Sequence, residues 1–296
     1  MKRLLSSYPS DYKKMRPEDF RQSIIASEGR TILAETVVTA APLLEGVTNA
    51  EVMTAFGADL IVLNEFDVFE KEIVGMEGIE NPIQQIKDWV GRPIGINLEP
   101  VDQEGTLHDQ QTHISPGRMV SKESLEAAQA QGVDFILLTG NPGTGVSMAS
   151  IEAAIKETKT CFSGLVFAGK MHGAGLADDL IDIPQLEKFI QEGADGILFP
   201  GSGTAPGVTE EQAYKATKAV HKLGGLVIAT IGTSQESADT GRIREFALSN
   251  KRIGADIHHI GDGGYGRMPD PMNMNYMRKI KELFDPDNRL NPGKIF

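Results

Sequence analysis

The sequence has one cysteine, Cys161, and this scarcity excludes an intramolecular disulfide and a cysteine-ligated metal cluster within one chain. It has few basic residues: 41 acidic residues against 29 lysines and arginines give a formal charge of −12, unlike proteins that bind nucleic acid or anionic membranes. Residues 1–17 lack the apolar centre of a signal peptide, and no later run is as long as a membrane span. We therefore expect a cytoplasmic protein without nucleic-acid or membrane partners. Whether it forms a homo-oligomer stays open.

What the sequence does contain is a repeated phrase: Gly, a small residue and Asp, followed by an apolar run that ends in polar residues. The clear copies begin at Gly57, Gly132, Gly193 and Gly254. Weaker copies precede apolar runs at 31–36, 95–100, 165–172 and 226–233. Each run is continuous, as in strands buried on both faces, and helical patterns separate the runs by the length of a βα unit.

Eight such units predict an α/β fold, a closed (βα)₈ barrel of the phosphate-binding type, with an open doubly wound sheet as the alternative. We expect a single domain over 1–296, in which 17–30 form an N-terminal helix, 31–267 the barrel, and 268–296 a C-terminal helix and tail. The first helix, over 17–27, should plug the bottom of the barrel. Helices are expected over 121–131, 183–192, 210–223 (N-capped by Thr209) and 275–284, and the long connection 101–118 is interpreted as a lid.

Active sites of such barrels lie where the strands end, so polar residues at these positions are the catalytic candidates. The ionisable candidates are Glu35, Glu65, Glu99, Lys170 and His172; Asn64, Asn97, Thr139 and Asn141 also end strands. A lysine among apolar residues can form a Schiff base, with His172 as general acid or base, and simple anion binding is the alternative. The side chains of His258 and His259 must point to opposite faces, so only one can reach the site.

Three glycine-rich strand ends predict an anion site, because glycine lets backbone N–H groups approach a phosphate closely. The predicted phosphate-binding residues are Gly201, Ser202, Gly203, Thr204, Gly232, Thr233, Gly263 and Gly264. The alternative is that these glycines only make tight turns. Carboxylates at the same rim, Glu65, Asp67, Glu99 and Asp262, are candidate ligands for Mg²⁺, with solvated or paired carboxylates as the alternative.

The segment from Arg16 to Arg267 resembles a bacterial family of phosphate-type barrels that is sometimes labelled phosphonomutase-like or dehalogenase-like. The resemblance rests on 34–68, GKMHGAG, GADGILFPGSGTAPGVT, ATIGTSQE and HHIGDGGYG. It implies the barrel and a small phosphorylated or otherwise anionic, carbohydrate-like ligand, but no reaction. The tail 276–296 is instead similar to the C-terminal signature of FAD-linked oxidases, in which the element matching Asn291–Lys294 helps to close a flavin site; the FAD-binding domain of those proteins is missing here.

The sequence therefore predicts an enzyme that acts on a small phosphorylated sugar or keto acid, as a lyase (aldolase type) or an isomerase. One alternative is a flavin oxidoreductase whose glycine-rich loops hold the phosphate of FMN, although flavin is less favoured than Mg²⁺ as a cofactor. Another is a protein that binds a phosphorylated metabolite without catalysis, because a fold does not determine chemistry.

Overall fold

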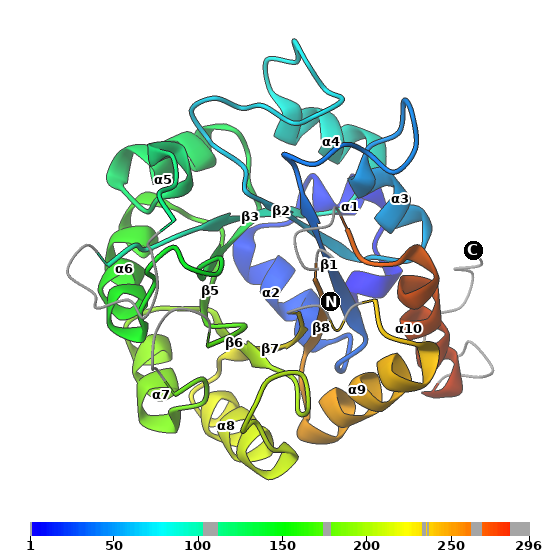
Figure 1. Cartoon of the computed structure of the whole chain (residues 1–296), viewed down its shortest axis with the longest axis vertical. Coiled ribbons are helices and arrows are strands. Elements are labelled where there is room, and N and C mark those ends of the chain that lie inside the picture. The colour runs from blue at the N-terminus through cyan, green and yellow to red at the C-terminus, as the bar shows by residue number, and fades with distance from the viewer. Residues whose placement is uncertain are drawn as a thin grey trace.

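The computed structural model describes residues 2–102, 112–173, 179–232, 235, 237–261 and 268–284. Its strands are parallel and pair in chain order until β8 pairs with β1, which closes a barrel (Figure 1). The strands are β1 Thr31–Val37, β2 Leu60–Asn64, β3 Ile94–Leu98, β4 Phe135–Leu138, β5 Leu165–Gly169, β6 Gly196–Pro200, β7 Leu226–Ile231 and β8 Ile257–Ile260. The predicted (βα)₈ barrel is confirmed, and the open-sheet alternative is wrong because an open sheet would leave β1 and β8 unpaired.

The helices fill the intervals between the strands as expected. They are η1 Leu4–Ser6, α1 Pro9–Tyr12, α2 Pro17–Ile25, α3 Asn49–Ala55, α4 Pro82–Val90, η2 Pro116–Arg118, α5 Lys122–Ala130, α6 Met148–Cys161, α7 Ile183–Gln191, α8 Glu210–Lys222, α9 Thr240–Ile253 and α10 Pro271–Phe284. Thr209 caps α8 as predicted, since its side chain accepts a hydrogen bond from the backbone N–H of Gln212. Among the described residues, no helix combines the length and apolar character needed to cross a membrane.

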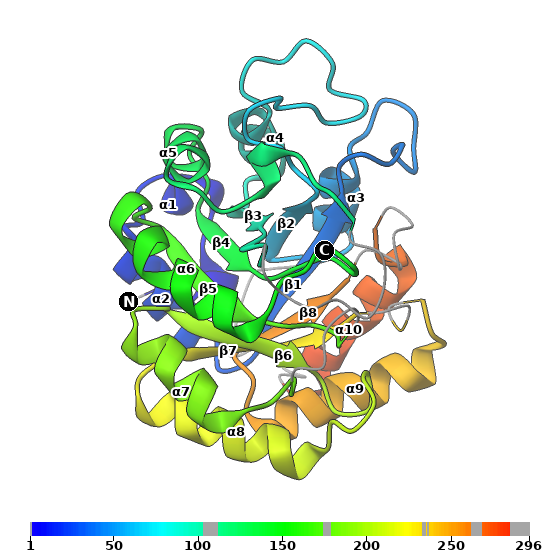
Figure 2. The same cartoon turned by 60° about the vertical axis from the view of Figure 1, so that its left-hand side comes forward.

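Helix α2 closes the end of the barrel at which the strands begin. Phe20 and Ile24 of α2 pack with inward-pointing side chains such as Leu33, and the Phe20 ring centroid lies 6.3 Å from that of Phe135. Figure 2 shows α1 and α2 on the left, at the side where the strands start. Because apolar side chains fill this end, the open end for a ligand is the other one, where the strands terminate.

The aspartate of the repeated Gly-x-Asp phrase has the same role in each of its four clear copies. Its carboxylate precedes an even-numbered strand and accepts a hydrogen bond from a backbone N–H near the start of the preceding strand. The aspartates are Asp59, Asp134, Asp195 and Asp256, and the respective donors are Ile32, Ile94, Val166 and Val227. Each carboxylate also contacts an ionisable side chain of a helix: Arg278, Lys87, Lys159 and His221, respectively. The phrase therefore joins strands and helices at the bottom of the barrel.

Helix α10 is the helix that follows β8, and it packs against α9, α3 and β1. It begins at Pro271, earlier than the predicted start at Asn275, because the Asp270 carboxylate accepts a hydrogen bond from the Met272 N–H. Its Arg278 forms a buried ion pair with Asp59. The helix is thus part of the barrel wall. The flavin-type signature Asn291–Lys294 and the central part of the expected lid, 103–111, lie outside the described residues.

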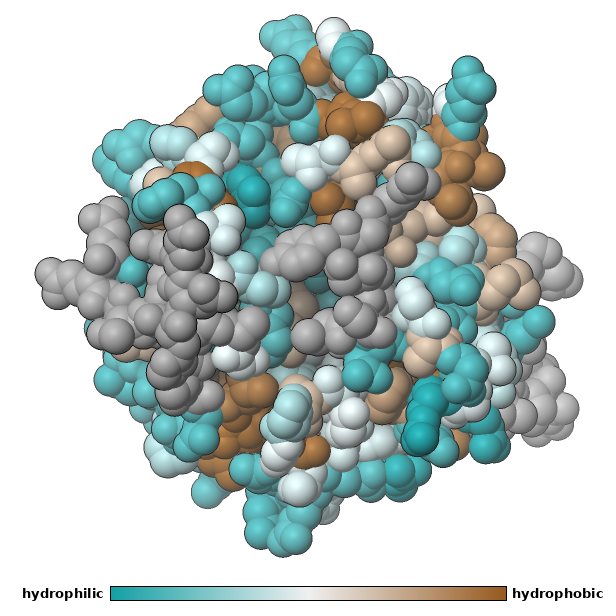
Figure 3. Space-filling model, in the orientation of Figure 1, coloured by the Kyte–Doolittle hydropathy of each residue, from teal (hydrophilic) through white to brown (hydrophobic). Residues whose placement is uncertain are grey.

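The face in Figure 1 is largely polar, with an apolar patch at the upper right over the loop from β1 to α3 (Figure 3). Leu43 and Leu44 of this loop are 46% and 51% exposed. This patch lies on the rim and contributes no side chain to the row of polar groups described next.

Candidate active site

A row of amide and carboxylate side chains crosses the mouth of the barrel. Asn97 Nδ2 donates hydrogen bonds to Glu35 Oε1 at 2.8 Å and to Asn64 Oδ1 at 3.0 Å. Asn64 and Asn141 exchange two hydrogen bonds of 3.0 Å, and Asn141 Nδ2 also donates to Glu99 Oε1 at 2.9 Å. The row joins the ends of β1, β2, β3 and β4, so these strand ends hold a common set of buried polar groups.

Glu35 and His259 form the end of this row. Glu35 Oε2 lies 2.6 Å from His259 Nε2, and both side chains are almost fully buried. His259 Nδ1 is also buried and has no hydrogen-bond partner. His258 points to the other face of β8, where its Nε2 lies 3.0 Å from the Gly29 carbonyl oxygen. The two histidine side chains thus point to opposite faces of β8, as predicted.

Lys170 and His172 follow β5, and the charges of Lys170 and of Glu35 both act on His172. Lys170 is 5% exposed. The pKa of His172 is lowered, first by burial and then by the charge of Lys170, while Glu35 and a hydrogen bond to the Gly140 backbone act in the opposite direction. His172 is therefore a neutral imidazole at pH 7 and can accept a proton.

Gly169, the last residue of β5, sets the direction of the chain that leads to Lys170. Its φ is +150°, and a Cβ atom at this position would lie 2.0 Å from the Leu198 carbonyl oxygen of β6. Any side chain would thus clash with the neighbouring strand, so glycine is required here.

Glu99 is the most completely hydrogen-bonded carboxylate of the site. Its Oε1 accepts from Arg118 Nη2 at 3.0 Å as well as from Asn141 Nδ2. Its Oε2 accepts from the Asn141 backbone N–H and from Thr144 Oγ1, both at 2.8 Å. A carboxylate with its lone pairs so occupied is a rigid support for Arg118 rather than a free base or metal ligand.

Glu65 and Asp67 are occupied by protein contacts as well. Glu65 accepts a hydrogen bond from Thr39 and lies 3.8 Å from Arg118 Nη2; its φ of +64° is unusual for a residue other than glycine. Asp67 accepts from the N–H groups of Phe69 and Glu70 at 2.8 and 3.0 Å. Burial raises the pKa of Asp67, but hydrogen bonds from the Ser115 side chain and from the backbone of Glu70, Phe69 and Gly117 outweigh it and lower that pKa.

The described donors therefore do not fit the expected Mg²⁺ site. The described residues contain no group of three or more His, Cys, Asp or Glu side chains placed to hold a metal. Glu65, Asp67 and Glu99 have the contacts just given, and Asp262 lies outside the described residues.

The glycine-rich loop after β6 donates most of its N–H groups within the protein. The Gly201, Gly203 and Thr204 N–H groups donate to the carbonyl oxygens of Thr230, Val208 and Gly201, respectively. These N–H groups are thus not free for an anion, which favours the tight-turn alternative at these positions. Ser202 belongs to the same turn, Gly232 is buried with no atom within 4 Å of a Cβ built on it, and Thr233, Gly263 and Gly264 lie outside the described residues.

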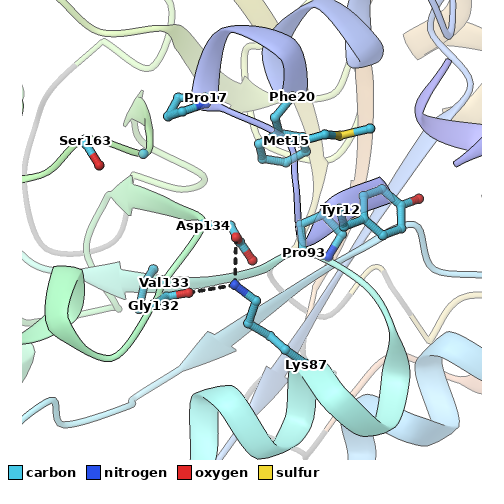
Figure 4. Close-up of a pocket in the computed structure, with 11 residues that line it drawn as sticks. Tyr12, Met15, Pro17, Phe20, Lys87, Pro93, Gly132, Val133, Asp134 and Ser163 are labelled. Carbon is cyan, nitrogen blue, oxygen red and sulfur yellow. Dashed lines mark hydrogen bonds and ion pairs between the residues drawn. The ribbon is translucent and has the colours of Figure 1, made fainter. Parts of the chain in front are cut away.

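A separate hollow of about 230 Å³ lies at the opposite end of the barrel, between the N-terminal segment and the starts of β3, β4 and β5 (Figure 4). Lys87 extends from α4 toward β4 and donates to Asp134 Oδ1 and to the Gly132 carbonyl oxygen, both at 2.8 Å (Figure 4). Burial raises the pKa of Asp134 although Lys87 opposes this shift. Since none of its lining residues ends a strand, this hollow is distinct from the candidate active site.

Sequence reasoning assigns no specific role to Asn97 and Asn141 beyond their position at strand ends, and it does not single out Arg118. The position of the two asparagines at strand ends is visible in the sequence. Their hydrogen-bond partners come from other strands, so these contacts are not. Arg118 lies within the segment interpreted as a lid, and nothing near it in the sequence points to Glu99.

Comparisons with solved structures support the barrel. The chain is similar to 2,3-dimethylmalate lyase, a member of the PEP mutase/isocitrate lyase superfamily, at 14% identity and a TM-score of 0.50, covering 94% of this chain and 90% of that one. It is similar to a Schiff base forming fructose-1,6-bisphosphate aldolase at 14% identity and a TM-score of 0.54, covering 90% and 98%. Thiamine phosphate pyrophosphorylase from Pyrococcus furiosus matches at 14% identity and a TM-score of 0.50, covering 86% and 97%. At these identities the likeness concerns the fold alone.

Sequence comparison gives one family. The family described as "Domain of unknown function (DUF7916)" matches residues 5–280, which include every strand of the barrel and most of α10. No curated protein sequence matches the chain significantly.

Proposed function

Because the chain belongs to the DUF7916 family, whose description assigns no reaction, we propose a function from the mouth of the barrel. The protein is a lyase that breaks or forms a carbon–carbon bond beside the carbonyl group of a small keto acid or phosphorylated sugar. Lys170 is its nucleophile and His172 transfers protons.

The observation that carries this proposal is the placement of Lys170. Lys170 is almost fully buried and directly follows the last residue of β5, and the lowered pKa of His172, on which the charge of Lys170 acts, leaves a neutral base close to it. An amine nucleophile with an adjacent base is the arrangement that imine chemistry requires. Two proteins of similar fold support the choice of reaction class, since one is named a lyase and the other a Schiff base forming aldolase.

In the proposed reaction His172 takes a proton from the Lys170 ammonium, and the neutral Nζ then attacks the substrate carbonyl carbon. The carbonyl oxygen leaves as water with one proton from Nζ and the proton that His172 returns, so the imine that forms is protonated. The protonated imine then accepts the electron pair of the adjacent Cα–Cβ bond as that bond breaks and an enamine forms. His172 takes the proton from the hydroxyl group on Cβ, which becomes the carbonyl group of the departing product. His172 returns this proton to the enamine carbon, and water hydrolyses the imine to restore Lys170.

Reductive trapping tests this proposal directly. Purified protein is incubated with pyruvate or dihydroxyacetone phosphate and cyanoborohydride, and the tryptic peptides are analysed by mass spectrometry. An adduct on Lys170 blocks cleavage after that residue and joins peptide 160–170 to peptide 171–188. Lys170→Arg should abolish both the adduct and turnover, by more than about 10³-fold, because a guanidinium cannot form the imine.

The matched control is Lys159→Arg. Lys159 pairs with Asp195 at the bottom of the barrel and lies outside the mouth, so trapping at Lys170 should persist in this variant. If a substrate is turned over while no adduct forms, the covalent mechanism is wrong. If Lys170→Arg keeps full activity, Lys170 only neutralises an anion, and the proposal fails.

A further inference from the structure

Arg118 lies beside Glu99 and Glu65, and the mechanism above gives it no role. It ends η2, in the segment between β3 and α5, and its side chain is 17% exposed. Its Nη2 lies 3.0 Å from Glu99 Oε1 and 3.8 Å from Glu65 Oε1. Two carboxylates thus hold one corner of the guanidinium.

The other edge of this guanidinium, formed by Nε and Nη1, donates no hydrogen bond to the described part of the chain. Both ion pairs run through Nη2, whereas Nε is buried and has no hydrogen-bond partner. Within the described ranges no residue accepts a hydrogen bond from Nε or Nη1. A buried donor without a partner costs free energy, so an edge left in this state indicates an acceptor that comes from outside the protein.

The place of Arg118 relative to Lys170 suits a substrate that spans both. The Gly140 backbone hydrogen-bonds His172, and the next residue, Asn141, donates both of its N–H-bearing groups to Glu99, which holds Arg118. Arg118 and Lys170 therefore lie on the two sides of the end of β4. A substrate whose carbonyl carbon lies at Lys170 can extend its anionic group toward Arg118.

We propose that the Nε and Nη1 edge of Arg118 is the anion subsite of this lyase and that it takes a carboxylate. This inference rests on the proposed function and narrows its substrates to keto acids. A planar carboxylate matches this edge of a guanidinium with two parallel hydrogen bonds. A phosphate group needs further donors such as backbone N–H groups, and the loop after β6 offers few free ones.

The subsite is tested by anion binding, which needs no turnover. Titration calorimetry measures oxalate and, separately, inorganic phosphate with the wild-type protein and with Arg118→Lys. The lysine keeps the charge beside Glu99, so the fold is retained, but it cannot form the bidentate contact; thermal unfolding checks the fold. We expect oxalate to bind the wild type more tightly than phosphate and Arg118→Lys to weaken oxalate binding at least about tenfold.

The matched control is Arg242→Lys, because Arg242 is an exposed arginine that pairs with Glu245 on α9 and should leave oxalate binding unchanged. Unchanged oxalate binding in a folded Arg118→Lys protein would overturn the subsite. Tighter binding of phosphate than of oxalate through Arg118 would overturn the restriction to keto acids.

The two proposals fail separately. If no adduct forms on Lys170 but oxalate binding still depends on Arg118, the subsite stands and the covalent mechanism falls. If the adduct forms, the pyruvate concentration for half-maximal trapping should rise about tenfold in Arg118→Lys, with the final amount of adduct unchanged. An unaltered half-maximal concentration would contradict the role of Arg118 while leaving that of Lys170 intact.

Discussion

The imidazole of His221 lies 2.8 Å from the carboxylate of Asp256, where Lys87 and Lys159 hold the equivalent aspartates of two other copies of the Gly-x-Asp phrase. The hydrogen bond with Asp256 raises the pKa of His221, and burial opposes this shift. A histidine whose pKa is higher in the folded than in the unfolded chain stabilises the fold below its unfolded pKa of about 6.5. That contribution disappears as the pH rises through the folded pKa.

Replacing His221 with lysine should therefore remove one source of pH dependence, since lysine stays charged. The side chain of His221 is 39% exposed, so solvent screening limits the effect to about 0.5 kcal/mol. Urea unfolding of the wild type and His221→Lys at pH 6 and pH 8.5 measures it. The free energy of unfolding of His221→Lys, relative to that of the wild type, should be higher at pH 8.5 than at pH 6. A difference between the two proteins that does not change with pH would contradict the role of this pair.

A second prediction concerns the ion pair that fastens α10. Arg278 Nη1 donates to both oxygens of Asp59, at 3.0 and 2.8 Å, and the two side chains are 5% and 2% exposed. Arg278→Met keeps the volume but leaves a buried carboxylate without its cation, which should lower the free energy of unfolding by about 3–5 kcal/mol. Urea denaturation at pH 7 is the measurement.

The control for this change is Arg242→Met on α9. Arg242 and Glu245 are 64% and 66% exposed, and such surface pairs contribute less than about 1 kcal/mol. Equal losses in the two variants would show that the Arg278 pair does not fasten α10 to the barrel.

The barrel could be predicted from the sequence because its evidence is local. Each Gly-x-Asp phrase and the apolar run after it lie within a few residues, and the aspartate accepts from the preceding strand in every clear copy. The start of α10 was missed because Asp270 caps it from just outside the apolar periodicity.

The site could be predicted only in part, because its contacts join distant positions. Glu35 and Lys170 could be named as candidates because one lies near the end of β1 and the other directly after β5. The contacts of Asn64 with Asn141 and of Asn97 with Glu35 depend on the stagger of neighbouring strands, which the sequence does not reveal. The composition of the loop after β6 predicts anion donors, because it does not show that the glycine N–H groups already have partners.

A third prediction concerns His258, whose burial lowers its pKa to about 4, despite an opposing hydrogen bond to Gly29. Since the folded pKa lies below the unfolded value, the neutral histidine stabilises the fold fully above pH 6.5, and this contribution is lost as the pH falls toward 4. At pH 5 the free energy of unfolding should be about 2 kcal/mol lower than it is above pH 6.5, since each pH unit between the two pKa values costs about 1.36 kcal/mol.

His258→Gln tests this contribution, because glutamine does not titrate and its amide can still donate to the Gly29 carbonyl oxygen. The drop in the free energy of unfolding between pH 7 and pH 5 should be smaller in this variant than in the wild type. An equal drop would mean that His258 is not the group that titrates.

The last prediction concerns the proton-transfer role of His172. Burial is the largest cause of its lowered pKa, followed by the charge of Lys170, while the Glu35 carboxylate raises that pKa. Lys170→Met should therefore raise the pKa of His172, since it removes a positive neighbour. Glu35→Gln should lower it, since it removes a negative one. In both variants the pKa should remain below 6.5 because burial is retained.

NMR titration of the imidazole protons measures these shifts, with His172→Asn used to assign the resonance among the six histidines. Lys159→Met is the matched control: Lys159 pairs with Asp195 at the bottom of the barrel, so its removal should leave the His172 titration unchanged. Shifts of opposite sign for Lys170→Met and Glu35→Gln would place both charges beside the imidazole, as a base acting on a lysine-bound substrate requires. If neither variant moves the titration, the two charges do not act on His172, and it cannot be the base for a substrate held by Lys170.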